Sequence, residues 1–98
     1  MKRILAKSTL RSFWEKHPNC EQNLKTWYKT VKDSNWSTPN EIKKVYGTAS
    51  IVSNNRVVFN IKGNEYRLVV KFNFERGWAF IRFIGTHKEY DKIDVTII

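Results

Sequence analysis

The sequence predicts an α+β fold, in which a small antiparallel β-sheet carries two to three N-terminal helices packed on one face. The main observation is a single change in the spacing of apolar residues, near Gly47. Before this glycine apolar residues recur at helical spacing, and after it they alternate as in half-buried strands. The second observation is the length of 98 residues, which without repeats or linker-like stretches predicts one domain over residues 1–98.

The first two helices are predicted from apolar stripes. One runs from residue 8 or 9 to about residue 17, where Pro18 ends it. The next follows Asn19, which is its predicted cap. Its apolar residues have the spacing of an amphipathic helix: Leu24, Trp27, Tyr28 and Val31.

A third, shorter helix is predicted from its end signals. Thr38 can cap it, Pro39 suits its first turn and Glu41 can complete a capping box. Gly47 is a typical residue to follow its last turn. At the start of the chain, residues 2–6 are predicted to form a short strand.

Longer strands are predicted at residues 56–62, 65–74 and 78–84, because these segments are rich in β-branched and aromatic residues. A two-residue turn at Gly63-Asn64 sets the register of the first pair. The register places these apolar residues opposite one another: Val57 and Val70, Phe59 and Leu68, Ile61 and Tyr66. A slip by one residue would turn this apolar set outward, which favours the register.

The second strand pair is predicted to turn at Arg76-Gly77. This turn gives the following pairs on the apolar face: Phe72 with Ile81, and Val70 with Phe83. On the other face it places Lys71 opposite Arg82.

The face away from the helices is therefore predicted to carry a row of cations. The row consists of Arg56, Lys71 and Arg82, with Arg67, Trp78 and Phe80 on the same side. Like charges opposite one another destabilise a strand pair, and the net charge of +9 already indicates a polyanionic partner. Guanidinium groups match phosphates and aromatic rings stack on unpaired bases, so this face predicts contact with nucleic acid. The alternative is a solvated face, on which long cationic side chains cover the two aromatic rings.

The segment after the last strand holds the candidate acid–base residues. His87 and Tyr90 share a face if this segment forms a helical turn, and they would lie beside the cationic face. Histidine exchanges protons near neutral pH, and a tyrosine hydroxyl can donate to an oxyanion or accept a proton. The sequence leaves open which of the two acts as base, and whether residues 94–98 form a strand or a tail.

Other chemistry finds little support in the sequence. Cys20 is the single cysteine, so no internal disulfide is expected and the reducing cytoplasm is the expected location. No carboxylate cluster indicates a metal site, no glycine-rich loop indicates nucleotide hydrolysis, and no cofactor is expected. No apolar run approaches the roughly 20 residues of a membrane span, so no membrane partner is expected.

The blocks NIKGNEYRLV and FIGTHKEYDKID resemble the HigB toxins of bacterial toxin–antitoxin modules, within the RelE/ParE superfamily. The segments LRSFWEKHP and IKKVYG are similar as well, so the resemblance covers nearly the whole chain. It implies a RelE-like fold and a metal-independent endoribonuclease that cuts messenger RNA on the translating ribosome and stops growth. It also implies a helix-turn-helix antitoxin, HigA, which neutralises the toxin and carries the contact with operator DNA.

The resemblance also assigns roles to residues. Arg67, within YRLV, matches the arginine that superfamily members use to hold the scissile phosphate, and Arg82 matches a second basic position. His87 and Tyr90 lie where relatives keep acid–base residues. The expected reaction is attack of the substrate's 2′-hydroxyl on the adjacent phosphate, which leaves a 2′,3′-cyclic phosphate and a 5′-hydroxyl. The expected RNA contacts are Arg56, Lys62, Lys71, Trp78 and Lys88.

Two other function classes remain open. A non-catalytic RNA-binding module would use the same cationic sheet and would tolerate replacement of His87 and Tyr90. A protein-directed toxin, as in the gyrase-poisoning branch of the superfamily, would stop growth with intact messages and damaged DNA. The THKEYDKI block favours the endoribonuclease.

Overall fold

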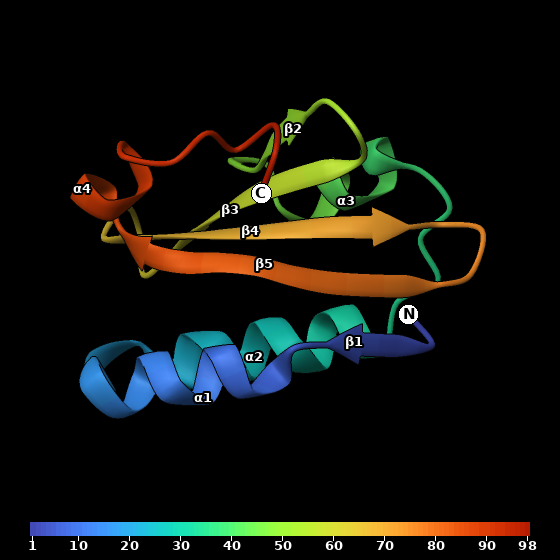
Figure 1. Cartoon of the computed structure of the whole chain (residues 1–98). Helices are drawn as coiled ribbons and strands as arrows, with labels where there is room; N and C mark the ends of the chain where they lie inside the picture. Colours follow the sequence, from blue (N-terminus) through green and yellow to red (C-terminus); the bar gives the residue numbers. More distant parts are fainter.

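The computed structural model describes residues 1–98 and shows a sheet flanked by helices, which confirms the α+β class (Figure 1). In chain order the elements are β1 (Arg3–Leu5), α1 (Lys7–Lys16), the 3-10 helix η1 (Pro18–Cys20), α2 (Glu21–Lys32), α3 (Pro39–Val45), β2 (Ser50–Val52), β3 (Arg56–Ile61), β4 (Tyr66–Asn73), β5 (Trp78–Thr86) and α4 (His87–Tyr90). Residues 91–98 form turns rather than a strand.

The strands form one mixed sheet of five strands in the order β1-β5-β4-β3-β2. Neighbours from β2 to β5 are antiparallel, whereas β1 runs parallel to β5. The short strand predicted at the start of the chain is therefore confirmed as β1. Strand β2 was not predicted.

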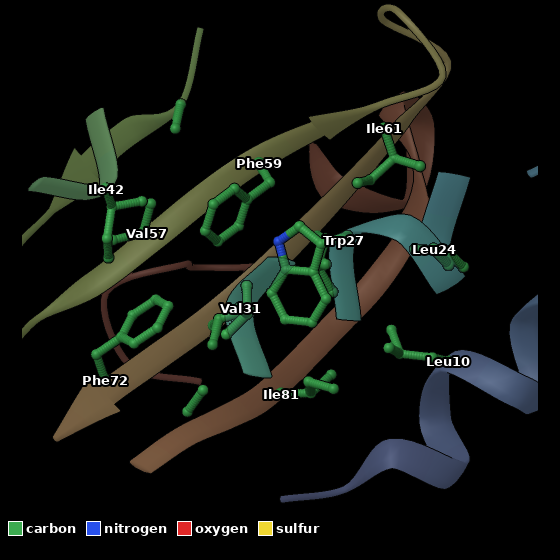
Figure 2. Close-up of a cluster of buried hydrophobic side chains, with 14 of the residues drawn as sticks. Leu10, Leu24, Trp27, Val31, Ile42, Val57, Phe59, Ile61, Phe72 and Ile81 are labelled. Carbon is green, nitrogen blue, oxygen red and sulfur yellow. The ribbon is translucent and has the colours of Figure 1, made fainter. Parts of the chain in front are cut away.

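Helices α1 and α2 lie side by side along one face of the sheet, as predicted (Figure 1). We call this side the inner face and the opposite side the outer face. On α2, Leu24, Trp27 and Val31 are at most 1% exposed, and they belong to the same core cluster as Leu10 of α1 and Phe59 of β3 (Figure 2). The core thus fills the inner face, and α1 and α2 leave the outer face free.

The predicted start of α3 is confirmed, because the Thr38 N–H donates to the Glu41 carboxylate at 3.2 Å. The predicted cap of α2 was wrong. Asn19 lies in η1, which forms a 3-10 turn between α1 and α2. Its side chain instead accepts a hydrogen bond from the Tyr66 hydroxyl at 3.0 Å and so links η1 to β4.

The predicted register between β3 and β4 is confirmed on both faces. In the turn, the Glu65 N–H donates to the Lys62 carbonyl oxygen at 3.3 Å, and Gly63 adopts a left-handed φ of 63°. The inner pairs are Val57 with Val70, Phe59 with Leu68, and Ile61 with Tyr66. The outer pairs are Arg56 with Lys71, Val58 with Val69, and Asn60 with Arg67.

The predicted register between β4 and β5 was wrong, because the loop is longer than a two-residue turn. Asn73 pairs with Trp78, so residues 74–77 form the loop. The Asn73 side chain accepts the Arg76 N–H at 3.1 Å, and Gly77 has a φ of 74°. A side chain that bonds its own turn and a glycine in the left-handed region together stabilise this longer connection.

A β-bulge then changes which residues of β5 face outward. Val70 pairs with Ile81 and Val69 pairs with Phe83, so Arg82 is the extra residue, without a partner in β4. Phe83 therefore shares the outer face with Val69, and its predicted place in the inner core was wrong. The observed pairs are Phe72 with Ala79 and Lys71 with Phe80, in place of the predicted Phe72–Ile81 and Lys71–Arg82.

The segment after α4 crosses the β3 side of the outer face (Figure 1). At its end, the backbone oxygen of Ile98 accepts hydrogen bonds from Nε and Nη2 of Arg56 at 2.8 and 2.5 Å. Val58, on the same face, is 2% exposed. Residues 91–98 therefore cover the β3 side of this face, and exposed side chains such as Lys71 and Arg82 lie on the β4–β5 side.

Candidate active site

Arg67, His87 and Tyr90 lie together at one end of the outer face. Nη2 of Arg67 is 3.5 Å from Nδ1 of His87, and the guanidinium carbon is 5.2 Å from the centre of the Tyr90 ring. Nε of Arg67 is buried and has no hydrogen-bond partner. A guanidinium only donates, so Nδ1 of His87 accepts in this contact and Nε2 is the ring nitrogen left free.

The pairing of β4 with β5 places these three residues. Arg67 lies directly beside Gly85, near the end of β5. Helix α4 begins at His87, directly after β5, so the chain folds back beside Arg67. His87 and Tyr90 are three positions apart on α4 and therefore lie on the same side of it.

The start of α4 is held by a capping box between Thr86 and Glu89. The Thr86 N–H donates to Oε1 of Glu89 at 2.8 Å, and the Glu89 N–H donates to Oγ1 of Thr86 at 3.3 Å. These bonds satisfy backbone groups that the first turn of a helix leaves free. The bonds from the Thr86 backbone and hydroxyl lower the pKa of the Glu89 carboxyl from its ordinary value.

The capping box gives α4 a defined pH dependence. Because the pKa of Glu89 is lowered in the folded state, its stabilising effect is complete above the ordinary glutamate pKa and is lost as the pH falls through the lowered value. We expect the NMR signal of the Thr86 amide proton to titrate with a midpoint below about 4.3, the ordinary value. Glu89→Gln, the matched control, should abolish this titration. A midpoint at or above 4.3 (about the ordinary value) would show that this carboxylate does not hold α4.

Gly85 allows close packing beside Arg67. A Cβ at this position would lie 2.6 Å from Cζ of Phe83 and 3.1 Å from Oε1 of Glu89. The Phe83 ring is in turn 6.4 Å from the Tyr90 ring, centre to centre. Sequence reasoning missed Gly85 and Phe83, although a glycine inside a strand often marks such an approach. The position of α4 therefore depends on residue 85 being a glycine, which has no side chain.

Gly85→Ala is expected to lower the free energy of unfolding by about 1–3 kcal/mol, because the methyl group overpacks a closed contact. It should also displace α4 and reduce any activity of His87 and Tyr90. Gly47→Ala is the matched control, since a Cβ at Gly47 meets no atom within 4 Å. Chemical denaturation of both variants measures the difference. Equal stability of the two variants would contradict the packing described for Gly85.

Arg82 lies on the same face but earlier in β5, three residues before Gly85, the residue that pairs with Arg67. The Arg82 guanidinium carbon is 5.0 Å from the centre of the Phe80 ring. No hydrogen bond joins Arg82 to the cluster of Arg67, His87 and Tyr90. The structure thus brings three of the four predicted catalytic residues into one cluster and places Arg82 beside it on the open surface.

Arg56 does not reach the open part of the outer face. It is 6% exposed, and its guanidinium is hydrogen-bonded to the backbone oxygen of Ile98. The predicted row of Arg56, Lys71 and Arg82 is therefore interrupted at its first member. The sequence could not show this, because the covering segment has no pattern that predicts where it packs.

The remaining expected RNA contacts fall in different places. Lys71 and Trp78 lie along the open side of the outer face, where both line a groove between β4 and β5. Lys88 is exposed on α4, next to His87. Lys62 lies in the turn between β3 and β4 and lines a separate hollow with polar residues of α2.

On the open part of the outer face, Arg67, Lys71 and Arg82 have no carboxylate partner. The ion pairs within 4.0 Å are Lys25–Glu21 and Lys29–Asp33, both along α2. The positive charges near Arg67 are therefore not neutralised within the protein. A bound polyanion would relieve their mutual repulsion.

Three further observations bear on other chemistry. No group of three or more His, Cys, Asp or Glu side chains is placed to bind a metal ion. Cys20 is buried, and burial raises the pKa of its thiol, which makes it a poor nucleophile. None of the helices has the length and apolar character needed to cross a membrane.

Comparisons with known proteins add evidence that is independent of this geometry. The family described as "HigB_toxin, RelE-like toxic component of a toxin-antitoxin system" matches residues 20–93, which include the cluster. The mRNA interferase HigB of Escherichia coli O6:H1 is 28% identical over 92 residues, covering 92% of this chain and 89% of the relative. The mRNA interferase toxin HigB of Escherichia coli K12 and the mRNA interferase HigB of Shigella flexneri are each 30% identical over 90 residues, covering 90% of this chain and 86% of the relative.

Proposed function

Because the chain belongs to the HigB family of RelE-like toxins, we propose that it is an endoribonuclease that cuts messenger RNA on the translating ribosome, in the cytoplasm. The names of the curated relatives, mRNA interferases, support the choice of substrate. The observation that carries the proposal is the contact of Arg67 with both His87 and Tyr90. The Arg67 guanidinium can bind a phosphate, and the neighbouring His87 and Tyr90 side chains can move protons. The surface around them provides no carboxylate partner for Arg67.

In the proposed reaction the 2′-hydroxyl of the RNA attacks the adjacent phosphorus, and the bond to the 5′-oxygen breaks. Negative charge grows on the phosphoryl oxygens during this step, and fixed donors stabilise it. The planar fork of Arg67 suits this role, because two parallel N–H groups match two phosphate oxygens. Since the nucleophile belongs to the substrate, the step needs no metal-bound water.

Two protons must move in this reaction. The 2′-hydroxyl loses one as it attacks, and the departing 5′-oxygen gains one. We assign these transfers to His87 and Tyr90, because both side chains lie beside Arg67 and therefore beside the phosphate that it would bind. The products are a 2′,3′-cyclic phosphate and a free 5′-hydroxyl.

The family is the toxic component of a toxin–antitoxin system, so an antitoxin is a partner of this chain. The finer proposal is a helix-turn-helix antitoxin of the HigA type, which neutralises the toxin and brings the complex to operator DNA. The net charge of +9 suits ribosomal and messenger RNA as the other partners, since the attraction of cations to phosphates does not depend on sequence.

The test is to add the purified protein to a translating extract and to the same message without ribosomes, and to map RNA ends by primer extension. Cuts are expected only in the translating sample. Equal cutting of both samples would refute the dependence on the ribosome. Growth arrest with intact messages and damaged DNA would identify a protein-directed toxin instead.

A further inference from the structure

An open groove lies on the outer face, along β4 and β5 and away from the catalytic cluster. It has a volume of about 260 Å³ and is lined mainly by Lys71, Asn73, Trp78, Phe80 and Arg82. The strand register explains why these side chains meet, since Lys71 pairs with Phe80 and Asn73 pairs with Trp78. The β5 side of the groove therefore carries the aromatic rings of Trp78 and Phe80. The basic and amide groups beside these rings are Lys71, Asn73 and Arg82.

Of the aromatic side chains that line this groove, Phe80 is exposed and Trp78 is partly exposed, whereas Phe72 is buried beneath them. The Phe80 side chain is 40% exposed on the outer face. The Phe80 ring has the Arg82 guanidinium 5.0 Å from its centre. Trp78 has two guanidinium groups close to its ring, at 5.7 Å from Arg3 and 5.1 Å from Arg76.

This combination has a specific chemical use. Proteins that bind single-stranded nucleic acid place exposed aromatic rings, on which bases stack, along a positively charged path that follows the backbone. None of the cations here is paired with a carboxylate, so each can meet a phosphate. We propose that the groove is a base-binding subsite, in which Phe80 and Trp78 stack on unpaired bases of single-stranded RNA.

The subsite rests on the proposed function, because it serves to position RNA for cleavage at Arg67. Lys71 is four residues from Arg67 on β4, which corresponds to about 13 Å at a strand rise of about 3.3 Å per residue. A strand of RNA that places a phosphate at Arg67 therefore reaches the groove within a few nucleotides. Residues 91–98 cover the β3 side of this face, which leaves β4 and β5 as the open path.

The experiment measures binding separately from cleavage. Fluorescence anisotropy follows the whole protein with labelled single-stranded RNA that carries 2′-O-methyl groups throughout, because this RNA lacks the attacking hydroxyl. A series of these RNAs has one abasic position moved along the strand. We expect the wild-type protein to lose affinity by at least about 5-fold at one or two neighbouring positions, since one stacking contact is lost. Phe80→Ala should lose at least about 5-fold on intact RNA and become insensitive to those positions.

Val45→Ala is the matched control, because Val45 is an apolar side chain 56% exposed on α3, outside the groove. It should bind RNA as the wild type does. Unchanged binding by Phe80→Ala, no measurable affinity of the wild type, or an even response to every abasic position would overturn the subsite. So would a Phe80→Ala variant that binds RNA normally and fails to capture the antitoxin. Since the RNA cannot be cut, failure of the proposed chemistry at Arg67 would leave this result unchanged.

Discussion

Arg67→Ala is expected to lower RNA cleavage by about 10²- to 10³-fold, the usual loss when one donor to a developing oxyanion is removed. The guanidinium contacts His87 and Tyr90 but forms no ion pair. Its loss therefore removes the proposed phosphate contact without leaving a carboxylate unpaired, and the variant should stay folded. Rates come from quantified primer extension in a translating extract, and folding is checked by thermal unfolding.

Two controls separate the role of Arg67 from its charge. Arg67→Lys keeps the charge and loses the fork, so its rate should fall between those of the wild type and the alanine variant. Arg11→Ala removes the same charge from an exposed position on α1, away from the outer face, and should leave the rate nearly unchanged. A folded Arg67→Ala protein that cuts at the wild-type rate would remove the basis of the proposed site.

The second large effect is expected from His87→Ala and Tyr90→Phe. General acid–base catalysis contributes about 10²- to 10⁴-fold, so at least one of these variants should lose activity on that scale. Tyr90→Phe is the sharper substitution. It keeps the ring beside Arg67 and Phe83 and removes only the hydroxyl.

The comparison of the two variants assigns the proton transfers. A large loss in Tyr90→Phe identifies the hydroxyl as the acid or base, and a large loss in His87→Ala alone identifies the imidazole. Tyr28→Phe, which removes a hydroxyl on α2, is the matched control and should be active. Full activity of both His87→Ala and Tyr90→Phe would instead support a non-catalytic RNA-binding module.

The sequence was most informative where alternation and turn chemistry agree. Gly63-Asn64 fixed one turn, and alternating apolar residues on both strands then allowed a single register, which the β3–β4 pairs confirm. The same alternation predicted that Arg67 and Lys71 share a face. Helix signals were equally direct at Thr38 and Glu41, where the capping box forms.

The sequence was least informative along β5. Phe80, Ile81, Phe83 and Ile84 are all apolar, so alternation could not reveal the bulge at Arg82. The bulge turns Phe83 outward, toward Tyr90. The longer loop, which precedes the bulge, pairs Lys71 with Phe80 instead of Arg82. The burial of Arg56 could not be predicted either, because the residues that cover it, 91–98, form turns and are distant in the sequence.

The chemistry of the RNA ends tests the central claim most directly. Messages cut by the protein in a translating extract are isolated, and their new ends are examined by treatment with polynucleotide kinase and phosphatase. If Arg67, His87 and Tyr90 promote attack by the 2′-hydroxyl, the fragments will carry 5′-hydroxyl and 2′,3′-cyclic phosphate ends. Fragments with 5′-phosphate and 3′-hydroxyl ends would show that water is the nucleophile and would contradict the proposed mechanism.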